Sequence, residues 1–190
     1  MLQKYIKDQR QRVIAWFIIK ALLLYIAWFI SYDFFIAPAG KVDAALNYRV
    51  ATDAGIILDL LGYEGGTQPG DRQTIVCIKN ETMVGVGNPC NGLELFVLFA
   101  GFIICFPGSW KNKWWYILVG SLIIHFVNVM RTVSLALIQF KAPEYLDFNH
   151  HYTFTIVVYS IIFFLWIFWT NRYSSLNELL NSDNNASKTS

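Results

Sequence analysis

Residues 114–140 read WWYILVGSLIIHFVNVMRTVSLALIQF, and this segment sets the class of protein. A helix needs roughly 20 mostly apolar residues to cross a bilayer, so the segment is long enough to span. It nevertheless contains His125, Asn128 and Arg131, whose spacing of three residues places them on neighbouring positions of one helix surface. An arginine near the centre of a membrane helix costs roughly 2.5–3.5 kcal/mol on insertion scales. This polar stripe must therefore face a bundle interior or a wet cavity.

Three further apolar segments accompany this one, at residues 13–36, 90–106 and 151–170. The 190-residue chain is 55% hydrophobic and only 15% charged, with a mean hydropathy of +0.41. Soluble domains carry about 25% charged residues, so the composition excludes an ordinary soluble globule, and its apolar character excludes a disordered chain. We therefore expect an all-α, polytopic membrane bundle of about four transmembrane helices.

Basic residues in the short flanks predict the orientation, because lysine and arginine concentrate on the cytoplasmic side. The N-terminal tail, the 107–113 turn and the position directly after the last segment are basic, whereas the 141–150 turn has one lysine and two acids. This pattern predicts cytoplasmic N- and C-termini, with the 37–89 loop and the 141–150 turn outside. The basic residues are Lys4, Lys7, Arg10, Arg12, Lys111, Lys113 and Arg172.

The 37–89 loop is expected to form a small extracytoplasmic cap on the bundle. Apolar residues recur with helical spacing over residues 42–61, which predicts a helix lying apolar face down on the membrane surface. GYEGGTQPGD is expected to be a turn-rich break, and RQTIVCIKNETMVGVG to form two short strands around a Lys-Asn-Glu turn. Residues 1–173 then form one membrane-embedded domain, followed by a polar, disordered tail at 174–190.

Cys90 is the first candidate functional residue. Asn88 suits a helix N-cap and Pro89 the first helical position, so Cys90 is expected in the first turn of a helix. The unpaired N–H groups and the positive dipole end found there favour a reactive thiolate. Glu94, one turn further, is a candidate partner for Arg131 or for a neighbouring helix.

His150 and His151 open the last segment at the same outer level, and histidine suits acid–base chemistry near neutral pH. Cys90 lies at the start of the second segment, Arg131 in the outer third of the third, and the two histidines at the start of the fourth. All of them therefore lie at one face of the membrane. Helix packing is expected to let them meet. His125 lies deeper in the membrane and is read as structural, or as a support for Arg131.

Each residue also has an inert interpretation. A lone cysteine is usually filler, an interfacial histidine is usually a solvated anchor, and Arg131 can extend to the outer headgroups. Cys77 and Cys90 both lie outside the cytoplasm, so a disulfide between them is a rival to a free nucleophile. Cys105 is expected to serve packing. The sequence contains no paired metal-ligand spacing, no phosphate-binding loop and no nucleic-acid patch, so no metal, cofactor or nucleic-acid partner is predicted.

Taken together, the motifs resemble those of the exosortase/archaeosortase family of membrane cysteine transpeptidases. The carrying residues are Cys90-Asn91-Gly92, Asn128-Val129-Met130-Arg131, and His150 in Phe148-Asn149-His150-His151. Their order and membrane level both fit, over about residues 85–170. The spacing from His150 to Phe154 and Tyr159 favours His150 over His151.

The resemblance implies a cysteine peptidase or transpeptidase in a bacterial cytoplasmic (inner) membrane, with its active site on the extracytoplasmic side. Cys90, Arg131 and His150 would be catalytic, with supporting roles for His151, Asn128 and Glu94. Its substrates would be exported proteins that end in a sorting signal of motif, transmembrane helix and basic tail, in pathways tied to exopolysaccharide production. The short members of the family lack several helices, which leaves open a membrane partner or a second copy. The alternative function is a non-catalytic scaffold of a secretion or exopolysaccharide apparatus.

Overall fold

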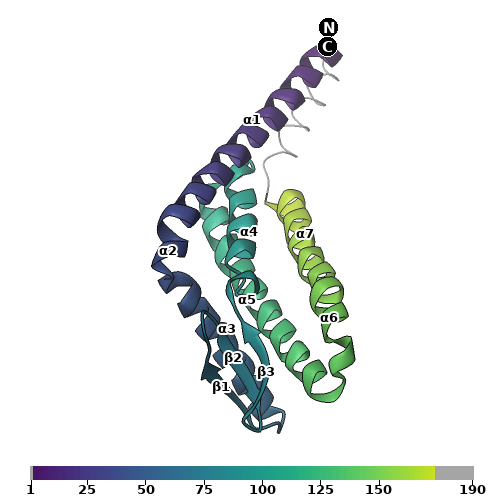
Figure 1. Cartoon of the computed structure of the whole chain (residues 1–190). Helices are drawn as coiled ribbons and strands as arrows, with labels where there is room; N and C mark the ends of the chain where they lie inside the picture. Colours follow the sequence, from purple (N-terminus) through teal and green to yellow (C-terminus); the bar gives the residue numbers. More distant parts are fainter. Residues whose placement is uncertain (1, 174–190) are drawn as a thin grey trace.

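The computed structural model describes residues 2–173, with side chains described from residue 14 onward, except that of Pro89. The tail at 174–190, which we expected to be disordered, lies outside the described residues. Long helices lie along one another over most of the molecule, and a small sheet with its own helix gathers at one end (Figure 1). The expected division into a helical bundle and a small cap is therefore observed.

The bundle consists of α1 (Leu2–Ser31), α4 (Leu93–Cys105), α5 (Trp110–Lys141) and α7 (Phe154–Arg172). Successive members run in opposite directions, so that the start of α1 and the end of α7 lie at the same end of the molecule (Figure 1). The short connecting elements are the π-turn Tyr32–Ile36, α2 (Ala37–Ala39), the 3₁₀ turns Asn88–Cys90 and Pro143–Tyr145, α6 (Leu146–Phe148) and the π-turn Asn149–Thr153.

Three helical stretches of the described chain are long and apolar enough to cross a membrane, namely Ile14–Ala39, Trp110–Lys141 and Pro143–Arg172. The expected segment at 90–106 forms α4, whose 13 residues extend about 20 Å at the helical rise. A hydrocarbon core is about 30 Å thick, so α4 alone is too short to span it. It packs instead along the first half of α5, where the ring of Phe99 occupies the space that a side chain at Gly120 would need.

The cap contains a three-stranded antiparallel sheet of β1 (Gly65–Pro69), β2 (Thr74–Ile78) and β3 (Glu81–Val86), in that order. The two expected strands form as β2 and β3, joined by Lys79 and Asn80, which both have positive φ, as a tight hairpin turn requires. The expected turn-rich break was wrong in part, because it contains β1. Gly65 lacks a side chain, so β1 can lie close against the helix Lys41–Leu60. A prediction based on turn residues does not anticipate this contact.

The cap helix is α3 (Lys41–Leu60). It packs on β1, β2 and α5 through a stripe of seven buried residues. Val42, Ile56 and Leu60 of the expected apolar face are 43%, 54% and 81% exposed. These three residues are covered neither by the sheet nor by the bundle, so the expected contact of this face with a membrane surface stays a prediction. The buried stripe, which includes two polar residues, was not anticipated. The stripe comprises Asp43, Asn47, Val50, Ala51, Ala54, Gly55 and Leu58.

The single helix α5 belongs to two hydrophobic cores. Its first half packs with α4 and α7 around Phe99, Ile124 and Trp169, each of which is at most 1% exposed. Its second half contributes Val129, Val133 and Ala136 to a core shared with α3 and the sheet. Because α5 is continuous and belongs to both cores, it fixes the position of the cap relative to the bundle.

Adjacent glycines of β1 offer a test of the packing between the sheet and α3. A Cβ at Gly65 would collide with the Gly55 carbonyl oxygen and with Leu58, whereas a Cβ at Gly66 meets open space. We expect Gly65→Ala to destabilise the protein by about 1–3 kcal/mol through overpacking. The readout is the apparent melting temperature of purified protein in detergent. Gly66→Ala is the matched control and should melt like the wild type, and equal melting of both variants would contradict this packing.

Candidate active site

Cys90 lies on a short turn between the cap and the bundle. It ends the 3₁₀ turn Asn88–Cys90, and its N–H donates to the carbonyl of Gly87 at 2.8 Å. Helix α4 begins only at Leu93, after Gly92, which adopts a φ of +85°. The expectation that Cys90 occupies the first turn of this helix was therefore wrong, because the left-handed conformation of Gly92 separates the turn from the helix.

Buried amide side chains fix this turn. The Asn128 Nδ2 donates to the carbonyl of Cys90 at 2.9 Å, and the Asn91 Nδ2 donates to Asp43 Oδ1 at 2.7 Å. Asn91, Asn128 and Asp43 are 0%, 1% and 2% exposed. The hydroxyl of Tyr32 also donates to Asp43, at 3.3 Å. The π-turn Tyr32–Ile36 and the helices α3 and α5 thus hold the backbone that carries the Cys90 thiol.

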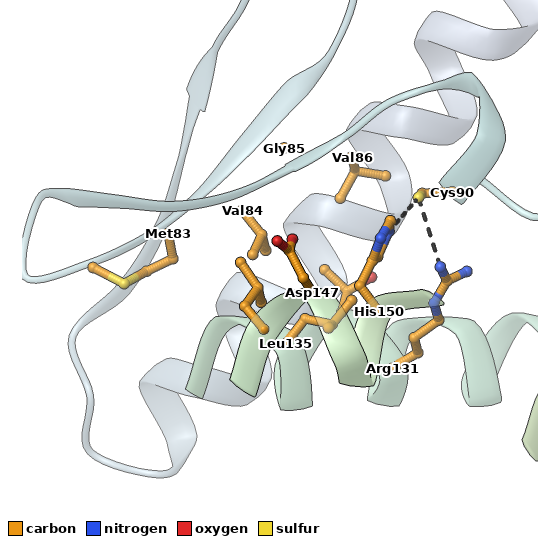
Figure 2. A pocket seen from close by; sticks show the side chains of 11 residues that line it. Met83, Val84, Gly85, Val86, Cys90, Arg131, Leu135, Asp147 and His150 are labelled. Atoms are coloured by element: carbon orange, nitrogen blue, oxygen red, sulfur yellow. Dashed lines mark hydrogen bonds between the residues drawn. The ribbon is translucent and has the colours of Figure 1, made fainter. Parts of the chain in front are cut away.

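The side chains of Cys90, Arg131 and His150 meet in this structure. The Cys90 Sγ lies 3.5 Å from His150 Nε2 and 3.8 Å from Arg131 Nη2, and Figure 2 shows the imidazole and the guanidinium approaching the sulfur from different helical segments. Within the described chain, no carboxylate forms an ion pair with Arg131, and its buried Nε has no hydrogen-bond partner. The guanidinium is therefore directed at the sulfur without a competing anion.

A cavity of about 240 Å³ opens beside these three residues. It lies between β3 on one side and the helices α5 and α6 on the other (Figure 2). The remaining lining residues are Met83, Val84, Gly85, Val86, Thr132, Leu135, Leu146 and Asp147. Their mostly apolar character, with a few converging polar groups, is typical of a ligand site.

The two adjacent histidines point in different directions. His150 faces Cys90, whereas the exposed His151 places its Nδ1 3.0 Å from the backbone carbonyl of Asp147. Both belong to the π-turn Asn149–Thr153, a widened turn that offsets neighbouring side chains and is frequent at functional sites.

Two of the other predicted polar residues lie elsewhere. Glu94 does not contact Arg131, because it lines a separate cavity of about 540 Å³ between α1, α4 and α7, together with Asp33. His125 places its Nε2 2.9 Å from Asp53 Oδ2 on α3, and so joins the cap to α5. Its structural role was anticipated, whereas its partner was not. The Asn128 side chain contacts the Cys90 carbonyl.

The cysteines are all free, so the expected alternative of a Cys77–Cys90 disulfide is wrong. Cys77 is 2% exposed within β2, and burial raises the pKa of its thiol. Cys105 is 5% exposed in the last turn of α4, consistent with its expected packing role. Cys90 is thus the one cysteine of the chain that lines the cavity next to a histidine and an arginine.

Sequence reasoning missed Asp43, Asp53 and Asp147, and gave Asn91 no role. A signal for Asp43 was present, since it stands four residues before Asn47 and both lie on a helix that otherwise reads as amphipathic. Asp147 had no distinguishing signal, because an acidic residue in an outer turn is ordinary.

Comparison with known proteins places these observations in a family. The chain matches a family model described as transmembrane exosortase over residues 10–169, which is most of its length. No curated protein matches the chain, and no solved structure does. The matched region contains the whole bundle core, the cap and the cluster of Cys90, Arg131 and His150. The chain belongs to the transmembrane exosortase family.

Proposed function

We propose that this protein is a cysteine transpeptidase or peptidase that processes C-terminal sorting signals of exported proteins. The supporting observation is the meeting of one thiol, one imidazole and one guanidinium at 3.5 and 3.8 Å, beside a cavity large enough for part of a polypeptide. Family membership supports the same class of chemistry. The cluster lies at the outer end of the bundle in the orientation that the basic residues predict.

The proposed reaction begins with Cys90. His150 Nε2 takes the thiol proton, and the thiolate sulfur attacks a peptide carbonyl of the substrate. The carbon–nitrogen bond then breaks, and the proton on His150 passes to the departing amine. A thioester remains on Cys90, and an amine or a water molecule resolves it, giving a new amide or a carboxylic acid. No group beyond the protein, the substrate and this second nucleophile is required.

Arg131 has the geometry to stabilise charge during this reaction. Its guanidinium lies beside the sulfur and lacks a carboxylate partner in the described chain, so it can hold the thiolate or the carbonyl oxygen as that oxygen becomes negative. A donor of this kind is typically worth about 10²–10³ in rate. That benefit offsets the cost of keeping an arginine in a membrane helix.

The buried amides prepare the site for this chemistry. Asn128 and Asn91 fix the Cys90 turn before substrate arrives, so little ordering remains to be done in the transition state. Asn128 therefore acts as a positioning residue for the nucleophile. His151 lies outside the reacting cluster and serves here as an internal comparison for His150.

The first prediction concerns the nucleophile. We expect Cys90→Ala to abolish processing of a co-expressed protein that ends in a motif, a transmembrane helix and a basic tail, because no other thiol lines the cavity. The readout is the size of the substrate in membranes and medium. Cys105→Ala removes a buried thiol from the other end of α4 and should leave processing intact. Undiminished processing by Cys90→Ala would favour the non-catalytic scaffold.

A second prediction separates the two histidines. His150→Gln should slow processing by about 10²–10⁴, the usual contribution of general acid–base catalysis, because it removes the group that exchanges a proton with Cys90. His151→Gln should process at close to the wild-type rate. The initial rates of the two variants, compared at equal protein levels in the membrane, measure this difference. A larger loss in His151→Gln would reverse the assignment.

A third prediction addresses the accessibility and side of Cys90. A membrane-impermeant maleimide added to intact cells, without reductant, should modify Cys90. It should spare Cys77, because that thiol is buried and its pKa is raised, and Cys105, which is buried at the opposite end of α4. Mass spectrometry of the purified protein gives the modified positions. Modification of Cys90 only after the cells are opened would contradict the proposed orientation.

A further inference from the structure

The free edge of the cap sheet borders the candidate active site. In the strand order β1-β2-β3, β3 is an edge strand that pairs only with β2. Its four consecutive residues 83–86 all line the cavity that contains Cys90. Side chains of successive strand residues point to opposite faces, so four in a row reach one cavity only if that cavity lies against the edge of the strand. Figure 2 shows β3 running above this space, with α5 and α6 on the other side.

The ladder between β1 and β2 determines which backbone groups of β3 are free. At its two ends, Lys79 N–H donates to the Glu64 carbonyl and Gly70 N–H donates to the Gln73 carbonyl. Antiparallel pairs alternate between bonded and non-bonded positions, so every second residue of β2, counted from Gln73, faces β1. The intervening Thr74 and Val76 must therefore direct their backbone groups towards β3.

In the regular part of the β2–β3 ladder, before the register shift between Val76 and Cys77, Gly85 is the residue of β3 that this alternation leaves unpaired. Thr74 is opposite Val86 and Val76 is opposite Val84, so both valines use their N–H and C=O groups towards β2. Gly85, between them, points its N–H and C=O away from β2 towards the free edge. No other backbone hydrogen bond reaches residues 81–86 within the described part of the chain. A donor and an acceptor are thus exposed five residues before Cys90.

We propose that the polypeptide substrate binds in an extended conformation along the free edge of β3, pairing its backbone with Gly85 and presenting its scissile bond to Cys90. This inference rests on the proposed function and specifies how that substrate is held. Strand addition at a sheet edge draws affinity from the main chain, with side chains entering adjacent pockets. The 240 Å³ cavity, with apolar Met83, Leu135 and Leu146, fits one or two substrate side chains.

Edge pairing also solves a geometric requirement of the reaction. A thiolate must approach the carbonyl carbon from above the peptide plane, and a substrate held as a strand has a fixed peptide plane at each position. The turn that follows β3 carries Cys90 and is fixed by Asn128 and Asn91. The strand that orients the substrate and the residue that attacks it are therefore parts of one rigid segment.

The test uses the full-length protein in detergent and two pools of probes. One pool contains N-acetyl tetrapeptidyl vinyl sulfones with randomised side chains, and the other contains the same compounds with methylated backbone nitrogens. The Cys90 sulfur adds to the vinyl group and the neighbouring carbon takes up a proton, so adduct formation on Cys90 reports binding. We expect the first pool to label wild-type Cys90 about tenfold faster, since methylation blocks hydrogen bonds worth that factor.

Variants at Gly85 then identify the edge. The three heavy atoms nearest to a Cβ at this position all belong to the end of the Gln73 side chain, so both variants are made in a Gln73→Ala background. Gly85→Pro removes the outward N–H without breaking the β2–β3 ladder and should abolish the tenfold preference. Gly85→Ala retains the N–H and should keep it. Labelling by iodoacetamide should be equal in both variants, because it requires only the thiol.

The outcomes distinguish this proposal from the proposed function. Equal labelling of wild type by the two pools, or a preference that survives Gly85→Pro, overturns edge binding, whatever the cleavage assay with Cys90→Ala gives. The protein could prefer the unmethylated probes in a Gly85-dependent way and yet process no tailed substrate. That result would support edge binding and contradict the proposed function. A change in the mass of the detergent-solubilised protein on Gly85→Pro would show that the edge pairs with a second copy, and would overturn the proposal.

Discussion

The hydrogen bond from the buried Asn128 amide to the Cys90 carbonyl is the constraint on which the site depends. It joins the turn after the cap sheet to the helix that also carries Arg131, so that one contact fixes the separation of sulfur and guanidinium. Burying an amide costs free energy unless it is hydrogen-bonded, and a bonded amide in a low-dielectric interior is hard to displace. The neighbouring Asn91–Asp43 bond acts in the same way from the side of α3. Cys90, the nucleophile that we propose, is thus held by polar contacts where a hydrophobic core alone would leave its turn free to shift.

The long helix α5 carries this constraint between two cores of different character. Its first half is held by aromatic and aliphatic packing against α4 and α7, and its second half by small and branched residues against α3 and the sheet. Arg131 stands at the junction, where neither core closes completely and a cavity remains. An arginine is tolerated there because its guanidinium points into the cavity beside Cys90 and His150 instead of into lipid. The fold therefore places Arg131, which is costly to insert into a membrane, beside the cavity where the reaction we propose would use it.

The contrast between the cysteines illustrates the same principle. Cys77 lies in the middle strand of the sheet, where burial raises the pKa of its thiol, and Cys105 lies in the packed end of α4. Cys90, only three residues ahead of α4, meets a histidine and an arginine because Gly92 ends its turn with a positive φ. The three thiols are chemically identical, and they differ only in their burial and in the groups beside them. The free edge of β3 extends this arrangement, since the strand that leads into Cys90 also offers unpaired backbone groups beside the cavity.

The sequence by itself determined the membrane class, the long apolar segments, the β2–β3 hairpin and the identity of Cys90, Arg131 and His150 as residues of one level. Those features follow from local hydropathy, turn chemistry and the cost of polar groups in a helix, which act over a few neighbouring residues. Only the tertiary structure decided that β1 is a strand, that α3 turns Asp43 inward and that Glu94 faces another cavity. It also decided that the His150 ring comes within 3.5 Å of the sulfur. These outcomes depend on which surfaces meet across distant segments, and the periodicity of one segment does not tell which other segment its buried face contacts.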